Sequence, residues 1–309
     1  MPVVLVRLLL AASTLFLVAC DYQEPYRYEP SYGTESPDGV REYIFGVHPQ
    51  RNPEKLHAIF GQVVDYLNAG LPQVRFVFEA SRHYQSYDEK IAVRHFNFLL
   101  PNPYETLLGI DQGYTVFAKM RRDEDLRGLI VVRRDSGIRT VADLKGKAVS
   151  FPAPTALAAT MLPMYFLQQN GLDVKHDIEP RYVGSMESSL LNIERSNVAA
   201  GTVYPPAWRM FKAERPELAA NLKVIWETEF LPNNSVMARD DVPQALVTKV
   251  KALLLNMHQD PEGQRILAEM DSQGFESADN EVYSPVRDFM LRYHCLLYTS
   301  DAADDETSG

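Results

Sequence analysis

Between residues 42 and 294, apolar residues follow two patterns, one typical of strands and one typical of helices. The change from one pattern to the other predicts where each strand and helix lies. Short apolar runs, typical of buried strands, alternate with longer segments whose apolar residues recur every three or four positions, as on one face of a helix. The first unit illustrates the pattern. A strand is predicted at 43–47, and the spacing from Leu56 to Leu67 predicts a helix that ends at Gly70 as its C′ residue.

The same pattern continues along the chain. Further strands are predicted at 74–79, 96–100, 114–119, 127–134, 147–151, 178–183, 199–203, 222–228 and 235–238. Further helices are predicted at 84–94, 103–111, 155–170, 186–195, 206–214, 243–258, 261–271 and 285–294, with a short one after Thr140, whose spacing to Asp143 resembles a capping box. Strands that alternate with helices are typical of α/β architecture with mostly parallel sheets.

The elements form two series joined by extended segments, which predicts two α/β lobes with a cleft between them. We expect residues 42–118 plus 235–294 to form lobe 1, and residues 119–234 to form lobe 2 with hinge strands at its ends. A chain of 309 residues is long enough for two such cores.

Composition narrows the class of protein. With 46% hydrophobic and 23% charged residues, the chain is neither disordered, fibrous nor a polytopic membrane protein. Its net charge of −10 argues against a nucleic-acid partner, because neutralising phosphates requires a surplus of Lys and Arg.

The first residues have the composition of an export signal. Residues 1–19 carry one positive charge, Arg7, followed by an apolar run that is short for a membrane span and ends in small residues before Cys20. This ending resembles the lipobox of bacterial lipoproteins, in which Cys20 becomes the lipidated N-terminus; the alternative is a plain secretory signal with a chance Cys. Residues 20–41, polar and interrupted by Pro, predict a tether. Asp21 after the Cys favours retention at the inner membrane.

The composition also changes abruptly after His294. Residues 295–309 resemble translated adapter sequence, which suggests a non-native tail; the alternative is an ordinary acidic tail. With Cys20 lipidated and Cys295 in this tail, no internal disulfide is expected.

Motifs of the common enzyme classes are absent from the sequence. The seven His form no HExxH pair, and there is no G-x-S-x-G, G-x-G-x-x-G or P-loop. We therefore expect no catalytic residues, no metal site and no cofactor. A constellation assembled from distant residues stays open as an alternative, since such sites are recognised by geometry.

Several motifs in the same order resemble the phosphate/phosphite/phosphonate-binding proteins of ABC importers. The resemblance spans about residues 43–294 and rests on 45–56 (FGVHPQRNPEKL), 100–104 (LPNPY), 131–138 (VVRRDSGI), 141–151 (VADLKGKAVSF), 184–187 (GSME), 199–203 (AAGTV), 231–235 (LPNNS) and 260–263 (DPEG). It implies the two-lobed type II periplasmic binding fold, which closes around a small ligand.

The resemblance also implies where an anion is held. In the family, a loop with Ser and Thr opens a helix of the second lobe, and its hydroxyls and free N–H groups bind the oxyanion. Here this loop reads PAPTALAAT at residues 152–160. Thr155 is retained as a ligand candidate or an ordinary N-cap. Ala156-Leu157-Ala158-Ala159 stands where the family has Ser-Thr-Ser-Gly, so hydroxyl donors are lost.

Other candidate ligand residues lie in loops that follow strands. Tyr204 stands near the position where the family's phosphonate binders have a carboxylate for an amine, and Met186 near that of a pocket His, which argues against an aminoalkylphosphonate. The remaining candidates, each with a plain structural alternative, are His48 and Arg51 in the first loop, Asn102 as ligand or helix cap, and Tyr104 as ligand or core residue.

Together these features predict a function. We expect a monomeric lipoprotein on the periplasmic side of the inner membrane that binds a small anionic solute and presents it to an ABC permease. One alternative keeps the fold but reports the solute to a sensor kinase or receptor, and another is an enzyme on the same scaffold.

Overall fold

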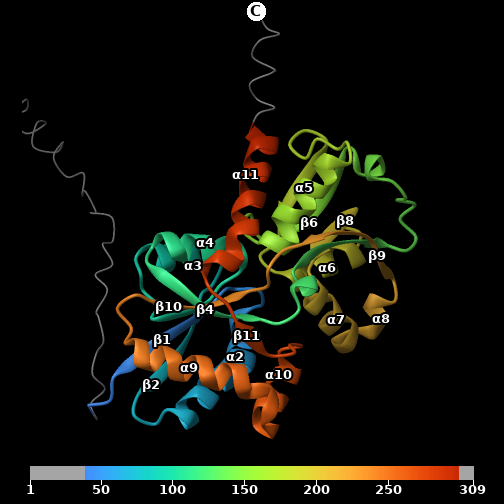
Figure 1. The fold of residues 1–309 in the computed structure, drawn as a ribbon. Helices are drawn as coiled ribbons and strands as arrows, with labels where there is room; N and C mark the ends of the chain where they lie inside the picture. The colour runs from blue at the N-terminus through green and yellow to red at the C-terminus, as the bar shows by residue number, and fades with distance from the viewer. Residues whose placement is uncertain (1–38, 299–309) are drawn as a thin grey trace, which may run out of the picture. The chain divides into compact units, whose positions relative to one another are not determined.

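The computed structural model describes residues 39–298, which fall within one compact unit (Figure 1). The predicted signal peptide, the lipidation site Cys20, most of the tether and residues 299–309 lie outside the described residues. None of the described helices is long and apolar enough to cross a membrane. The last helix continues past His294 to Tyr298.

One sheet has six strands in the order β11-β4-β10-β3-β1-β2. Its strands are β1 (Glu42–Val47), β2 (Arg75–Ala80), β3 (Phe98–Leu100), β4 (Tyr114–Met120), β10 (Ser235–Arg239) and β11 (Phe275–Ser277). The helices that follow these strands are α2 (Pro53–Gly70), α3 (Tyr84–Ala92), α4 (Pro103–Asp111), α9 (Gln244–Asn256), α10 (Pro261–Glu269) and α11 (Ser284–Tyr298). Figure 1 shows α3 and α4 on one side of the sheet and α2 and α9 on the other.

The other sheet has five strands in the order β7-β6-β8-β5-β9. Its strands are β5 (Arg127–Arg133), β6 (Lys147–Phe151), β7 (Ile178–Tyr182), β8 (Ala200–Val203) and β9 (Leu222–Phe230). Its helices are α5 (Leu162–Gln169), α6 (Met186–Glu194), α7 (Pro205–Glu214) and α8 (Pro216–Ala219). Every predicted strand is present, and β11 and α8 are additional elements.

Parallel pairing is confined to part of each sheet. The strands β1, β2 and β3 pair in parallel, as do β6, β7 and β8. The strands that precede or follow a crossing between the sheets, β4, β5, β9 and β10, pair antiparallel with their neighbours. Both sheets therefore contain parallel and antiparallel pairs. The antiparallel pairs arise because the chain leaves a sheet through one strand and returns to it through another strand that runs in the opposite direction.

Local sequence signals place the helix starts. Asn52 accepts a hydrogen bond from the Lys55 N–H at 2.9 Å and is followed by Pro53 in the first turn. The expected pairing of Asp143 with the Thr140 N–H is present at 2.8 Å.

The prediction that Gly70 ends α2 as a left-handed residue is wrong. Gly70 belongs to the helix, where a side chain would come within 2.7 Å of the Leu253 side chain.

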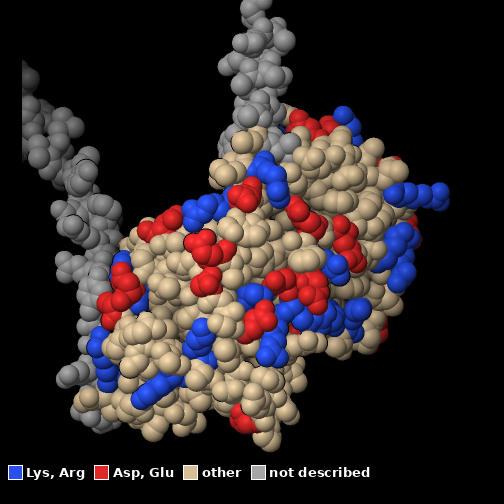
Figure 2. Space-filling model, in the orientation of Figure 1, with Lys and Arg blue, Asp and Glu red and all other residues tan. Residues whose placement is uncertain are grey.

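Two apolar clusters build the interior. The larger covers the five-stranded sheet and extends to α3 and α11 through Tyr87 and Phe289, whereas the smaller lies between the six-stranded sheet and α2, α9 and α10. Helix α11 contacts both α4 and α5, so it packs on elements of both sheets. On the face seen in Figure 2, acidic and basic side chains are intermingled, with no large patch of one sign.

Candidate functional site

Loops at the carboxyl ends of strands from both sheets line a cavity of about 20 Å³, which we call the inner cavity. It is lined by His48, Tyr84, Asn102, Leu126, Ala156, Leu157, Ala158, Ala159, Met186, Tyr204 and Asn234. Open α/β sheets bind ligands at this edge, because the loops there converge on one crevice. None of these described side chains is a Lys, Arg, Asp or Glu, so an ionic partner for a ligand is not among them.

The loop after β6 contributes four consecutive residues, 156–159, to the lining of this cavity. The chain there forms one π-helical turn, Leu157–Met161, that continues into α5, instead of the uniform helix predicted for residues 155–170. Within the described residues, the N–H groups of Leu157, Ala158 and Ala159 have no hydrogen-bond partner. Free amides at the positive end of a helix favour an anion.

A glycine in β5 lets this turn approach the sheet. A side chain at Gly128 would come within 2.7 Å of the Ala158 carbonyl oxygen. The absence of a side chain at Gly128 therefore lets β5 pack closely against the turn that carries the free amides.

His48, directly after β1, contributes an uncharged ring to the inner cavity. It is 3% exposed, and its Nδ1 lies 3.1 Å from the Leu100 carbonyl oxygen. Burial lowers the pKa of His48 to about 4, although the hydrogen bond to Leu100 opposes the shift. Because the carbonyl requires a proton on Nδ1, the Nε2 of the neutral ring is an acceptor.

Asn102 has two structural partners in addition to its place on the cavity wall. Its Oδ1 accepts from the Glu105 N–H at 3.1 Å as the N-cap of α4, and its Nδ2 donates to the Thr155 carbonyl oxygen at 3.1 Å. The second bond joins the first residues of α4 to the anion loop. Asn102 thus fixes this loop relative to the six-stranded sheet.

The carboxyl groups of Glu105 and Asp88 interact with the two residues of this contact, Asn102 and Thr155. Glu105 is fully buried and accepts from the Asn102 N–H at 2.9 Å; burial, followed by the nearby Asp88 charge, raises its pKa well above the usual range. Burial also raises the pKa of Asp88 to about 6, against the lowering effect of its hydrogen bonds with Thr155 and Glu105.

Tyr204 closes one side of the inner cavity. It caps the start of α7, is 8% exposed, and donates its hydroxyl hydrogen to Gln50 Oε1 in the loop after β1. Because Gln50 and Tyr204 belong to elements of different sheets, this hydrogen bond links the two sheets at the cavity edge.

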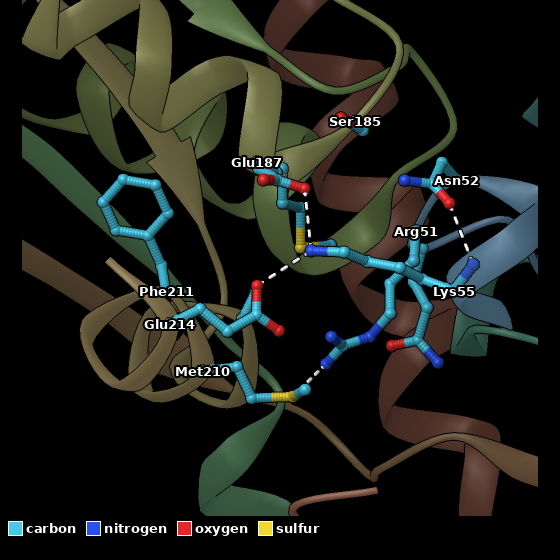
Figure 3. A pocket seen from close by; sticks show the side chains of 11 residues that line it. Arg51, Asn52, Lys55, Ser185, Glu187, Met210, Phe211 and Glu214 are labelled. Atoms are coloured by element: carbon cyan, nitrogen blue, oxygen red, sulfur yellow. Dashed lines mark hydrogen bonds and ion pairs between the residues drawn. The ribbon is translucent and has the colours of Figure 1, made fainter. Parts of the chain in front are cut away.

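Two further pockets lie outside this hydrogen bond, and we call them the outer pockets. One, of about 40 Å³, is shown in Figure 3 and lies between the start of α2 and helices α6 and α7. The other, of about 20 Å³, adjoins Asp125, Asp271 and the crossing segment at Asn233 and Asn234. Gln50 and Arg51 line both outer pockets.

Ion pairs between the sheets border the outer pockets. Lys55 Nζ lies 3.2 Å from a Glu187 carboxylate oxygen and 2.8 Å from one of Glu214, as Figure 3 shows. Arg209 pairs with both carboxylate oxygens of Asp125, at 2.9 and 3.0 Å, and its Nε lies 2.7 Å from Asp271.

The structure brings together only some of the predicted ligand residues. His48, Asn102 and Tyr204 line the inner cavity, and Arg51 lines the outer pockets. Thr155 and Tyr104 are not among the residues that line these three pockets. Thr155 contributes its carbonyl to Asn102, and Tyr104 packs partly buried against the larger apolar cluster.

Three lining residues were not predicted as candidates. Tyr84 begins α3, Leu126 lies in one crossing segment, and Asn234 lies in the other. Asn234 is 2% exposed, and its Oδ1 has no hydrogen-bond partner within the described residues. The run LPNNS at 231–235 contains Asn234 and was a signal for it, whereas nothing local singles out Tyr84 or Leu126.

The chain is similar to known proteins in both sequence and fold. A sequence model of the family described as "ABC transporter, phosphonate, periplasmic substrate-binding protein" matches residues 45–283. A probable ABC transporter phosphite binding protein of Prochlorococcus marinus (strain MIT 9301) is 19% identical over 186 residues, covering 56% of this chain and 63% of that protein. The phosphonates-binding periplasmic protein of Escherichia coli (strain K12) is 22% identical over 167 residues, covering 53% and 49%.

A solved structure has the same fold. It is that of PhnD1 from Prochlorococcus marinus (MIT 9301) in complex with methylphosphonate, with a TM-score of 0.75, 17% identity and coverage of 81% of this chain and 97% of that one. The chain spans 63% and 49% of the length of the two curated relatives that it matches. The two-sheet α/β architecture predicted from sequence is thereby confirmed as the type II periplasmic binding fold.

Proposed function

The chain belongs to the periplasmic substrate-binding proteins of phosphonate ABC transporters, and from this premise we propose that it binds a small oxyanion between its sheets and delivers it to an ABC importer. The ligand leaves chemically unchanged. The observation that carries this proposal is the set of free N–H groups at Leu157, Ala158 and Ala159, three residues that line the inner cavity.

The lining of the cavity favours an anionic head with a short apolar group. The free volume of the inner cavity is about 20 Å³, room for little more than a water molecule, so a ligand enters as the walls move apart; apolar and aromatic side chains make up much of these walls. A phosphonate with a short alkyl group fits this chemistry, because amides take its oxygens and the apolar wall takes the alkyl group. No described side chain of the cavity supplies a carboxylate for an amine.

Closure of two lobes would make the site. We assign lobe 1 to the six-stranded sheet and lobe 2 to the five-stranded sheet, close to the predicted boundaries, and the hinge to the segments before β5 and before β10. Ligand binding to both lobes stabilises the closed form, since only differential affinity shifts such an equilibrium. We further propose a monomer held by a lipid on Cys20 at the periplasmic side of the inner membrane.

Isothermal titration calorimetry of the purified protein with methylphosphonate, phosphite, phosphate and 2-aminoethylphosphonate tests the binding. We expect methylphosphonate to bind and 2-aminoethylphosphonate to bind at least about tenfold more weakly, because its amine finds no acidic partner. Absence of binding by every oxyanion would overturn the proposal.

A variant locates the site. Ala158→Asp places a negative charge at the free amides and should reduce methylphosphonate affinity at least about 100-fold. Ala252→Asp, at an exposed position of α9, is the matched control and should bind as the wild type does. Unliganded melting temperatures separate loss of binding from loss of folding, and equal affinity of both variants would place the ligand elsewhere.

A further inference from the structure

We propose that Arg51 and the outer pockets form a second anion subsite, so that the preferred ligand carries two anionic groups joined by a short chain. The oxyanion head occupies the inner cavity, and a carboxylate at the other end of the ligand pairs with Arg51. This inference rests on the proposed function, because it extends the same binding cleft.

The inner cavity and the outer pockets share walls. Tyr204 and Asn234 line both the inner cavity and the outer pocket near Asp271, and Met186 lines both the inner cavity and the pocket of Figure 3. The hydrogen bond between Tyr204 and Gln50 separates them. A ligand longer than its head group can therefore extend past this pair if the Gln50 side chain turns aside.

Arg51 is a cation without an acidic partner. Its guanidinium donates to the Met210 sulfur, and Figure 3 shows it directed into the pocket beside Met210. A thioether is a weak acceptor, so most of the five guanidinium donors remain available. Within residues 39–298, no carboxylate forms an ion pair with Arg51.

The carboxylates that line these pockets are already neutralised. Four cations match these four carboxylates: Glu187 and Glu214 pair with Lys55, Glu187 pairs also with Arg215, Asp125 and Asp271 pair with Arg209, and Asp125 pairs also with Arg122. The charge of Arg51 is therefore left uncompensated where the two sheets meet. A guanidinium pairs with a carboxylate through two parallel hydrogen bonds, which makes a carboxylate the matching group.

The same arrangement disfavours an amine at the far end of the ligand. An ammonium group would meet the Arg51 charge and would have to displace Lys55 or Arg209 to reach a carboxylate. We therefore expect affinity to decrease from carboxyalkyl to alkyl to aminoalkyl phosphonates of equal length.

Calorimetry with 3-phosphonopropionate and n-propylphosphonate tests the inference, because these ligands differ only in whether the far end is a carboxylate or a methyl group. We expect the wild type to bind 3-phosphonopropionate about 10-fold to 100-fold more tightly. Arg51→Met, which keeps an apolar stem, should abolish this preference and leave n-propylphosphonate affinity within about twofold. Arg139→Met, at an exposed loop position, is the control and should keep the preference.

The outcomes distinguish the two proposals. Equal binding of both ligands by the wild type, or a preference that survives in Arg51→Met, overturns the second subsite and leaves the proposed function intact. Failure of every oxyanion, 3-phosphonopropionate included, overturns the proposed function, and the second subsite with it. Arg51→Lys should keep part of the preference, and unliganded melting temperatures confirm that each variant folds.

Discussion

At the scale of single residues, burial decides which side chains of the cleft carry charge. Burial lowers the pKa of His48 to about 4 and raises the pKa of Glu105 well above its usual range, so burial disfavours charge on both side chains. Arg51 places a guanidinium at the cleft edge, where it lines both outer pockets. The cleft thus combines a neutral inner cavity with a charged entrance.

The buried His48 predicts a specific dependence of stability on pH. Its pKa is about 4 in the folded protein and 6.5 without burial, so the unfolded chain binds more protons between these values. The contribution to the free energy of unfolding is fully present above about pH 6.5 and is lost as the pH falls toward 4, by about 3 kcal/mol in total.

Urea unfolding of the wild type and His48→Asn at pH 7, 6, 5 and 4 measures this contribution. Asn can keep a donor to the Leu100 carbonyl but does not titrate, so its unfolding free energy should decrease less on acidification, by about 3 kcal/mol. His57→Asn, at an exposed position of α2, should retain the wild-type dependence. Parallel curves for the wild type and His48→Asn would contradict the role of burial.

At the scale of elements, the first residues of several helices place the functional groups of the site. The packing of these helices depends on close contact between backbone segments. Asn102 caps α4, Tyr204 caps α7, and the π-helical turn before α5 presents the free amides. Helix α10 begins in the same way, with Asp260 accepting from the Gly263 N–H at 2.8 Å. Its first turn lies so close to Met257 that only glycine fits at position 263.

Two glycine substitutions should therefore act in opposite directions. At Gly263 a Cβ would lie 2.1 Å from the Met257 carbonyl oxygen, so Gly263→Ala should lower the free energy of unfolding by roughly 2–4 kcal/mol. At Gly61 in α2 the nearest atoms are those of the His57 ring at 3.5 and 3.6 Å, an ordinary contact. Gly61→Ala should raise the free energy of unfolding by about 0.5–1 kcal/mol.

Urea unfolding followed by circular dichroism checks both values in one experiment. If Gly263→Ala were as stable as the wild type, the close packing of α10 on Met257 would be incorrect.

At the scale of the whole described unit, a few polar contacts connect the two sheets. They are the bonds from Asn102 to Thr155 and from Tyr204 to Gln50, and the ion pairs of Lys55 and Arg209. Because protein side chains make these contacts, closure of the two lobes in our proposal depends partly on exposed charged residues. Exposed ion pairs contribute about 0–1 kcal/mol each and weaken in salt.

Lys55→Met should shift the unliganded protein toward the open form. A loss of up to about 1 kcal/mol changes the ratio of closed to open molecules up to about fivefold, which increases the radius of gyration measured by small-angle X-ray scattering. Raising NaCl from about 10 to about 500 mM should also increase the radius of gyration of the unliganded wild type, and it should change that of Lys55→Met less. A wild-type radius that is independent of salt would contradict this role for the ion pairs.

The sequence by itself determined the succession of elements, the helix caps at Thr140 and Asn102, and the loops that reach the cleft. These depend on residues a few positions apart, whose spacing can be read directly. It indicated Arg51 through the position of this residue in the first strand-to-helix loop, whereas the loss of hydroxyls at residues 156–159 followed only from the resemblance to the binding-protein family.

Only the tertiary structure decided which side chains share a cavity. In the folded protein Tyr104 packs partly buried against the larger apolar cluster, and the Thr155 carbonyl oxygen accepts a hydrogen bond from Asn102. Folding also brings Tyr84 and Asn234 to the inner cavity. It also left Arg51 unpaired by matching the nearby carboxylates with Lys55 and Arg209. These outcomes depend on contacts between segments up to about 150 residues apart in the chain, which no local period records.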